Sequence, residues 1–198
     1  MSLATVDSSA KPAKRERNAN DFYSEPAWAV EGLLDVQRFS GLTLDPACGR
    51  GTIPTVFNAH GLNCIAADIV DRSDIFGGHF HHGDFLALDG ADRAVANIVC
   101  NPPFALAEPF LRKALDVASH KVAFLLRLSW LEGRKRRWAY EQAPFAAVHP
   151  FAARVSMPPG DSDIVAKGGA VAFAWLVWDH SHPIGAPAMM RRIERGPK

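Results

Sequence analysis

The chain has 198 residues, of which 48% are apolar and 22% charged, and its formal net charge is +1. This balance is typical of one globular domain, and it excludes a uniformly charged surface, so any affinity for a polyanion must be local. No apolar run approaches the roughly 20 residues of a membrane-spanning helix, and no secretion signal is recognisable. We therefore expect a cytoplasmic protein with no membrane partner and reduced cysteines.

Three regions are predicted along the chain. Residues 1–20 are small, polar and basic, which is typical of a disordered tail. One domain is expected over 21–182, and a C-terminal tail over 183–198.

Helical and strand-like segments alternate within the domain. Helices are predicted over 26–39, 52–60 and 108–119, and strands over 42–45, 63–68, 79–84, 94–100, 121–128 and 170–178. Such alternation predicts an α/β fold with a doubly wound, mostly parallel sheet. The polar stretch 156–169 is expected to be a loop, either disordered or a lid over a substrate.

The first distinctive motif is DPACGRGT, residues 45–52, between a predicted strand and a predicted helix. Gly49 and Gly51 let the backbone approach a ligand at the carboxyl end of the sheet. Asp68 ends the next strand, where an acid can accept hydrogen bonds from ribose hydroxyls. The fingerprint of dinucleotide-binding sites, G-x-G-x-x-G, has a third glycine at the position of Pro54, so a dinucleotide site is disfavoured.

The second motif is NPPF, residues 101–104, directly after a buried strand. Pro102 and Pro103 stiffen the turn and set the directions of nearby carbonyls. Asn101 supplies an amide oxygen that can accept from an amine, and Phe104 offers a flat face to a planar ring. Together these groups suit an exocyclic amine on a heterocycle.

The two motifs together resemble the class I S-adenosylmethionine-dependent amino-methyltransferases, and among them the DNA adenine-N6 group. The likeness covers about residues 22–180 and includes FYSEP (22–26), AAD (66–68) and GDF (83–85). It implies a seven-stranded sheet whose last strand is antiparallel, and S-adenosyl-L-methionine as cofactor. The cofactor contacts that it implies are Tyr23, Asp45, Pro46, Cys48, Gly49, Gly51, Thr52, Asp68, Ile69, Asp84 and Phe85.

The resemblance also implies roles for the NPPF residues. The side-chain oxygen of Asn101 and the carbonyl of Pro102 would accept the two amine hydrogens of the target base, in a turn that Pro103 stiffens. Phe104 would stack on the flipped base. Methyl transfer would then rest on positioning and local electrostatics, without a strong general base.

A basic and aromatic segment follows the fifth predicted strand. Arg127, Trp130 and Arg134 are predicted to bind substrate phosphates at the edge of the active site, although a solvated helix face would explain the same residues. His79, His81 and His82 have no carboxylate or cysteine at ligand spacing, so no metal site is predicted.

The sequence departs from the DNA enzymes in one respect. Only about forty residues lie between Leu128 and the last predicted strand, too few for a sizeable target-recognition domain. Specificity is therefore expected to be relaxed, or supplied by a partner or a homo-oligomer. Nucleic acid is the expected substrate, with DNA favoured over RNA. The alternatives are an RNA guanine-N2 or adenine-N6 methyltransferase, then a protein glutamine methyltransferase, and a catalytically silent binding module.

Overall fold

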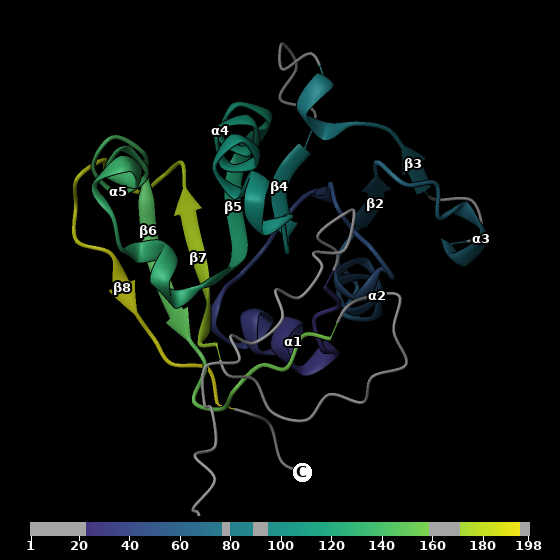
Figure 1. Ribbon diagram of the computed structural model, residues 1–198, viewed down its shortest axis with the longest axis horizontal. Coiled ribbons are helices and arrows are strands. Elements are labelled where there is room, and N and C mark those ends of the chain that lie inside the picture. The colour runs from purple at the N-terminus through teal and green to yellow at the C-terminus, as the bar shows by residue number, and fades with distance from the viewer. Residues whose placement is uncertain (1–22, 77–79, 89–94, 159–170, 195–198) are drawn as a thin grey trace, which may run out of the picture.

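The structure is a computed structural model that describes residues 23–76, 80–88, 95–158 and 171–194 (Figure 1). The strands are β1 Thr43–Asp45, β2 Cys64–Asp68, β3 Phe80–His82, β4 Val95–Cys100, β5 Ala118–Arg127, β6 Phe145–Pro150, β7 Phe173–Asp179 and β8 Met189–Met190. The α-helices are α1 Ala27–Val36, α2 Thr52–Ala59, α3 Ser73–Phe76, α4 Ala107–Val117 and α5 Trp138–Glu141. The predicted tail 1–20, His79 and residues 159–169 of the predicted loop lie outside the described residues.

All eight strands form one sheet in the order β3-β2-β1-β4-β5-β7-β6-β8. The pairs from β3 through β5 are parallel, whereas β7 lies antiparallel between β5 and β6. The predicted α/β fold and the antiparallel last long strand are therefore confirmed. The count of seven strands is corrected, because the two-residue β8 adds an eighth beside β6.

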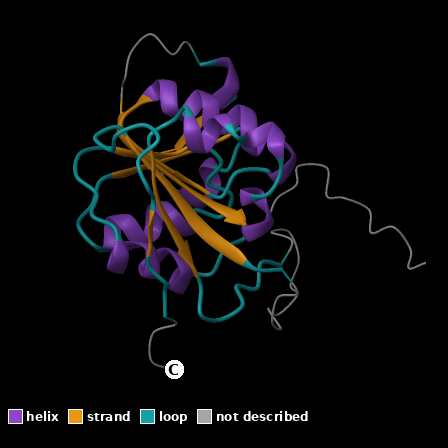
Figure 2. Cartoon of the chain, turned by 90° about the vertical axis from the view of Figure 1, so that its left-hand side faces the viewer, coloured by secondary structure: helices purple, strands orange, loops and turns teal. Residues whose placement is uncertain are grey.

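Helices cover both faces of the sheet, as Figure 2 shows. Residues of α1 and α2 pack on one face, and residues of α4 and α5 on the other. Two fully buried tryptophans of β7 contact the two helix layers. Side chains three residues apart on a strand point to opposite faces of the sheet, so each tryptophan reaches a different layer. The indole N–H of Trp175 donates to the carbonyl of Ala29 at 2.8 Å, and that of Trp178 to the carbonyl of Ala139 at 2.7 Å.

The segment predicted as a C-terminal tail contributes to the fold. Beyond β8, Ile193 is buried and its backbone bridges to Phe151. Its side chain fills the space above Gly32 of α1, where a Cβ would collide with it. The sequence around these positions carries no strand-like run, so only the contact with the rest of the molecule reveals the role of this segment.

The topology determines where a site can form. In a parallel sheet the carboxyl ends of the strands lie along one edge. Asp45, Asp68 and Arg127 are the last residues of β1, β2 and β5, and Asn101 directly follows β4. None of the described helices is long and apolar enough to cross a bilayer.

Candidate active site

A cleft opens at this edge of the sheet, between the ends of β1, β2 and β4. We call it the cofactor cleft after the contacts that the resemblance in sequence implies for its residues. It brings the two sequence motifs together with the segment that precedes α1. Its lining residues are Tyr23, Ser24, Glu25, Ala47, Cys48, Arg50, Asp68, Arg72, Asn101, Pro102, Pro103 and Phe104.

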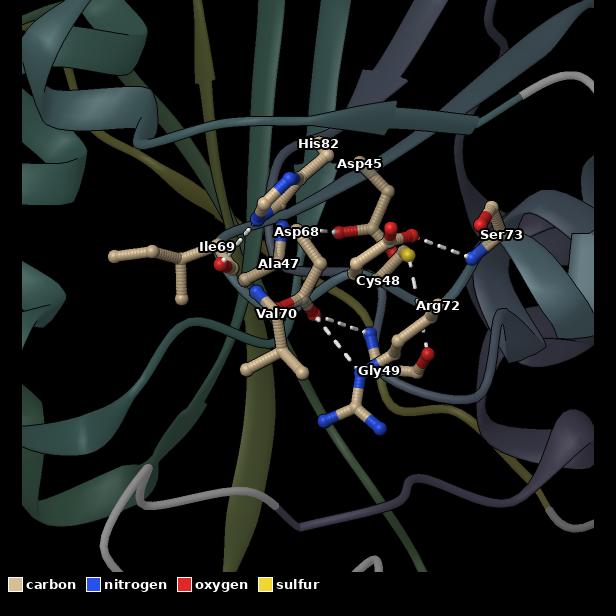
Figure 3. Close-up of polar contacts among 11 residues, drawn as sticks. Asp45, Ala47, Cys48, Gly49, Asp68, Ile69, Val70, Arg72, Ser73 and His82 are labelled. Atoms are coloured by element: carbon tan, nitrogen blue, oxygen red, sulfur yellow. Dashed lines mark hydrogen bonds and ion pairs between the residues drawn. The ribbon is translucent and has the colours of Figure 1, made fainter.

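The glycine loop is held by the acid at the end of β2. Gly49 and Gly51 have φ angles of 52° and 78°, a left-handed conformation that side chains rarely tolerate. The Asp68 carboxylate accepts the backbone N–H of Gly49 and that of Val70, each at 2.9 Å (Figure 3). Arg72 lies beside it, with its Nε 3.6 Å from the carboxylate. Asp68 therefore shapes the loop as well as facing the cleft.

Two further carboxyl groups lie near this loop. Glu25 is 8% exposed and Asp45 only 1%. Burial raises the pKa of Glu25 from 4.5 to about 7, despite hydrogen bonds with Asn101 and the Thr52 side chain. Burial, and then the charge of Glu25, raises the pKa of Asp45 well above its usual value. A cationic ligand in the cofactor cleft would favour the ionised form of both groups.

The cysteines of the chain, Cys48, Cys64 and Cys100, are free, buried thiols. Cys48 lines the cofactor cleft, where burial, and then the charges of Asp45 and Asp68, raises its thiol pKa. A thiol held protonated in this way is a poor nucleophile. The arrangement therefore favours binding by the loop over covalent catalysis by Cys48.

The two polar atoms of the Asn101 amide differ in their hydrogen bonding. Its amide nitrogen donates to the carbonyl of Tyr23 and to Oε2 of Glu25, both at 2.9 Å, and lies 3.8 Å from the Met157 sulfur. Its Oδ1 is buried and accepts no hydrogen bond among the described residues. A buried acceptor without a partner is costly, so this atom is ready to take a donor from a ligand.

The Phe104 ring lies among aromatic and cationic groups. Its centroid is 5.4 Å from that of Tyr23, with the rings 22° apart, and 5.9 Å from that of Phe173. The guanidinium carbon of Arg127 lies 4.6 Å from the ring centroid. Phe104 is half-buried, so its ring is both supported and accessible at the rim.

A second hollow adjoins the cofactor cleft at Phe104, and it collects most of the predicted substrate residues. Arg127, Trp130, Ser129 and Arg136 line it with Phe104 and two apolar neighbours. Arg136 donates to the carbonyl of Trp130 at 2.8 Å and lies over its ring, so it braces this loop. Arg134, which the sequence suggested, is exposed and is not among the lining residues.

Eight of the eleven predicted cofactor contacts are not among the residues that line the cleft, and three of the eight follow β2 or β3. Ile69 is 61% exposed just after β2. The Asp84 carboxylate accepts the N–H of Leu86 at 2.9 Å. Phe85 is buried in the core, where its ring packs 5.2 Å from that of Phe110. The side chain of Phe85 therefore belongs to the core.

The remaining motif residues lie in or behind the loop itself. Asp45 is buried at the end of β1, Pro46 follows it, and Thr52 begins α2. The lining residues that were not predicted are Ser24, Glu25, Ala47, Arg50 and Arg72. Glu25 lies within the quoted FYSEP segment, and an acid beside a predicted helix start was the available signal.

No group of three or more His, Cys, Asp or Glu residues in the described part of the chain could hold a metal ion.

No family model and no curated protein matches the sequence.

Solved structures do match the fold. The modification subunit of a candidate type I restriction enzyme from Vibrio vulnificus superposes with a TM-score of 0.60 at 16% identity, over 86% of this chain and 46% of that one. A candidate RNA methyltransferase from Pyrococcus horikoshii gives 0.57 at 17%, over 79% and 89%. Magnesium protoporphyrin IX methyltransferase from Synechocystis, with bound S-adenosylmethionine, gives 0.51 at 12%, over 77% and 76%.

The chain is similar in fold to structures described as S-adenosylmethionine-dependent methyltransferases. At these identities the likeness concerns the fold alone. The cleft lies at the carboxyl edge of the sheet, where ligands of open α/β sheets bind.

Proposed function

We propose that the protein transfers a methyl group from S-adenosylmethionine to the exocyclic amine of a nucleic-acid base, with adenine N6 in DNA as the leading substrate. The observation that carries this proposal is the buried, unpaired Oδ1 of Asn101 beside the Phe104 ring. An amine donor and a flat ring are the two features that such a pair of groups would recognise.

The residues of the cleft fit the cofactor. Gly49 and Gly51 give the loop before α2 its left-handed turns, and Cys48, Arg50 and Asp68 line the cleft beside it. Each carboxylate oxygen of Asp68 can accept a second hydrogen bond, so its bonds to Gly49 and Val70 leave capacity for ribose hydroxyls. The buried acids Glu25 and Asp45 would favour a cationic ligand.

The chain's own residues would act mainly by positioning. S-adenosylmethionine would supply an electrophilic methyl group and leave as the neutral thioether, and the methylated amine would then release one proton to solvent. Oδ1 of Asn101 and the carbonyl of Pro102 accept the two hydrogens of the target amine, which draws the nitrogen lone pair out of ring conjugation and leaves it available for attack. Phe104 holds the plane of the base, and the stiff Pro102–Pro103 turn keeps the acceptors in place.

The second hollow would receive the nucleic acid around the target base. Arg127, Ser129 and Trp130 combine a cation, a hydroxyl and an indole ring at the rim of the Phe104 site. Cations and aromatic rings are the usual components of single-strand binding surfaces. If the target lies in a duplex, flipping the base out costs a few kcal/mol, which contacts at this rim would offset.

An RNA base is the second candidate. The shared fold accounts for 89% of the Pyrococcus horikoshii candidate RNA methyltransferase but only 46% of the Vibrio vulnificus modification subunit. More of the Pyrococcus horikoshii neighbour is therefore covered, although the Vibrio vulnificus subunit matches more of this chain, 86% against 79%. Guanine N2 and adenine N6 both present the amine that Asn101 would accept.

One experiment tests the proposal and separates the candidates. The protein is given radiolabelled S-adenosylmethionine with unmethylated DNA, RNA or protein, and the modified nucleoside or residue is identified by mass spectrometry. N6-methyladenine in DNA supports the leading assignment, and a methylated base in RNA supports the second. Cofactor binding without transfer to any substrate identifies a silent binding module.

The Asn101→Ala variant provides the decisive control. It should lose methyl transfer and keep cofactor binding, because the amine contact acts on the transition state. Asn63→Ala removes an exposed asparagine from the loop before β2 and should retain activity. Full activity of Asn101→Ala on every substrate would show that NPPF is not the catalytic loop.

A further inference from the structure

The orientation of the Asn101 amide depends on the segment that precedes α1. Both hydrogens of its Nδ2 have acceptors, namely the carbonyl of Tyr23 and Oε2 of Glu25, each at 2.9 Å. These acceptors lie 78 and 76 residues away in the sequence. The end of β4 is therefore joined to a separate part of the chain at Asn101, the side chain to which the proposed function assigns the target amine.

Glu25 is held as firmly as the amide that it contacts. The residue is 8% exposed and immediately precedes Pro26, the N-cap of α1. Its carboxyl group also hydrogen-bonds with the side chain of Thr52, the first residue of α2. Glu25 thus joins the starts of two helices to Asn101, and its position does not depend on a flexible surface side chain.

The alternative orientation of the amide is unfavourable. If the amide were flipped, Oδ1 would face the Glu25 carboxylate and the Tyr23 carbonyl, so that acceptors would meet acceptors and both hydrogen bonds would be lost. The observed orientation directs Oδ1 to the position where it has no partner among the described residues. An ionised Glu25 also polarises the amide, which makes Oδ1 a stronger acceptor.

We propose that Glu25 is a positioning residue for the methyl-transfer step, which fixes the Asn101 amide so that Oδ1 accepts the target amine. This inference rests on the proposed function, since it assigns Oδ1 to the substrate. Glu25 does not touch the substrate in this scheme and acts only through Asn101. Its loss should therefore lower turnover more than it weakens the binding of either substrate.

Three variants test the proposal. Glu25→Ala removes the acceptor, whereas Glu25→Gln keeps an amide oxygen that can accept from Asn101. Glu31→Ala is the matched control, because it removes an exposed carboxylate from the adjacent helix α1. We expect kcat to fall about 10- to 100-fold in Glu25→Ala, the effect of losing one hydrogen bond to a charged group. The KM values should change less than about threefold, and Glu25→Gln should recover most of the activity.

A second readout does not depend on activity. The measurement is the exchange of the Asn101 side-chain amide protons with water, followed by NMR. Their signal is assigned by its disappearance in Asn101→Ala, and both protons should exchange slowly in the wild type. In Glu25→Ala one of them should exchange much faster. If Glu25→Ala does not fold, the kinetics of Glu25→Gln and the exchange rates in the wild type still test the positioning role of Glu25. Exchange in the wild type as fast as that of exposed Asn63 would overturn the proposal.

The two proposals fail in different ways. If Asn101→Ala is inactive but Glu25→Ala turns over at the wild-type rate, the positioning role is wrong and the proposed function stands. If Asn101→Ala is fully active, the proposed function fails whatever Glu25 does. A fall in kcat/KM for Glu25→Ala that lies wholly in the KM for S-adenosylmethionine would make Glu25 a cofactor-binding residue and would also overturn the inference.

Discussion

The guanidinium carbon of Arg127, the last residue of β5, lies 4.6 Å from the centroid of the Phe104 ring. A cation thus rests on the ring that we assign to the target base. Arg127 is exposed, so it can move aside when a base enters. Stacking on an aromatic ring is a contact that a base can replace, and the displaced guanidinium remains near enough to meet a phosphate.

Replacing Phe104 should affect both affinity and rate. Phe104→Ala removes a stacking face worth roughly 1–3 kcal/mol per base, so nucleic-acid binding should weaken by that amount and turnover should fall as well. Phe104→Tyr keeps the ring and should be tolerated. Fluorescence anisotropy with a labelled oligonucleotide measures the affinity, and thermal unfolding controls for lost packing against Tyr23 and Phe173. Equal affinities of the alanine variant and the wild type would exclude stacking on Phe104.

Replacing Arg127 should change the salt dependence of binding. If its guanidinium neutralises one phosphate, Arg127→Ala lowers the slope of log K against log salt concentration by about 1 and weakens binding to all sequences alike. Arg192→Ala is the control, because Arg192 is exposed and paired with Glu194 near the C-terminus. An unchanged slope in Arg127→Ala would leave Arg127 as a packing partner of Phe104 only.

Replacing Asp68 should weaken cofactor binding through two contacts. Asp68→Ala removes the acceptor for ribose hydroxyls and releases the N–H of Gly49, so the affinity for S-adenosylmethionine should fall by about 1.5–3 kcal/mol. Calorimetry measures this loss. Asp71→Ala, which removes an exposed acid three residues later, is the control. Unchanged affinity in Asp68→Ala would remove Asp68 from the site.

Sequence reasoning could place the motif residues at one edge of the sheet because each of them follows a recognisable strand. Gly49, Asp68 and Asn101 come after β1, at the end of β2 and after β4, and a parallel sheet brings such positions to one edge. The direction of a side chain is a different matter. Phe85 matches the GDF motif, yet its ring belongs to the core. A motif match gives a position in the chain, whereas packing decides where the side chain points.

The parts that sequence reasoning missed depend on distant partners. The sequence of β6, FAAVHP, contains two alanines and a proline, so it has no clear strand pattern. Its pairing with β7 makes it a strand. Ile193 stands alone in a polar segment, and its burial follows from the space above Gly32. Glu25 acquires its role from Asn101, 76 residues away. No local pattern encodes contacts of this kind.

The buried carboxyl of Glu25 should make stability depend on pH. Its pKa is raised from 4.5 to about 7 in the folded protein, chiefly by burial. Between these values the folded state keeps the proton that the unfolded state releases, so the free energy of unfolding should fall as pH rises through this window and level off above it. A pKa shift of this size changes the free energy of unfolding by about 3 kcal/mol. Asp45, whose pKa is also raised by burial, acts in the same direction.

Urea unfolding at a series of pH values, without cofactor, measures this effect. Glu25→Gln keeps the shape of the side chain but cannot titrate, so its unfolding free energy should fall by about 3 kcal/mol less than that of the wild type between pH 4.5 and 8. Glu31→Gln changes an exposed glutamate on α1 and should follow the wild-type curve. A Glu25→Gln curve parallel to that of the wild type would mean that Glu25 ionises in the folded protein as readily as in the unfolded chain, and that its burial carries no electrostatic cost.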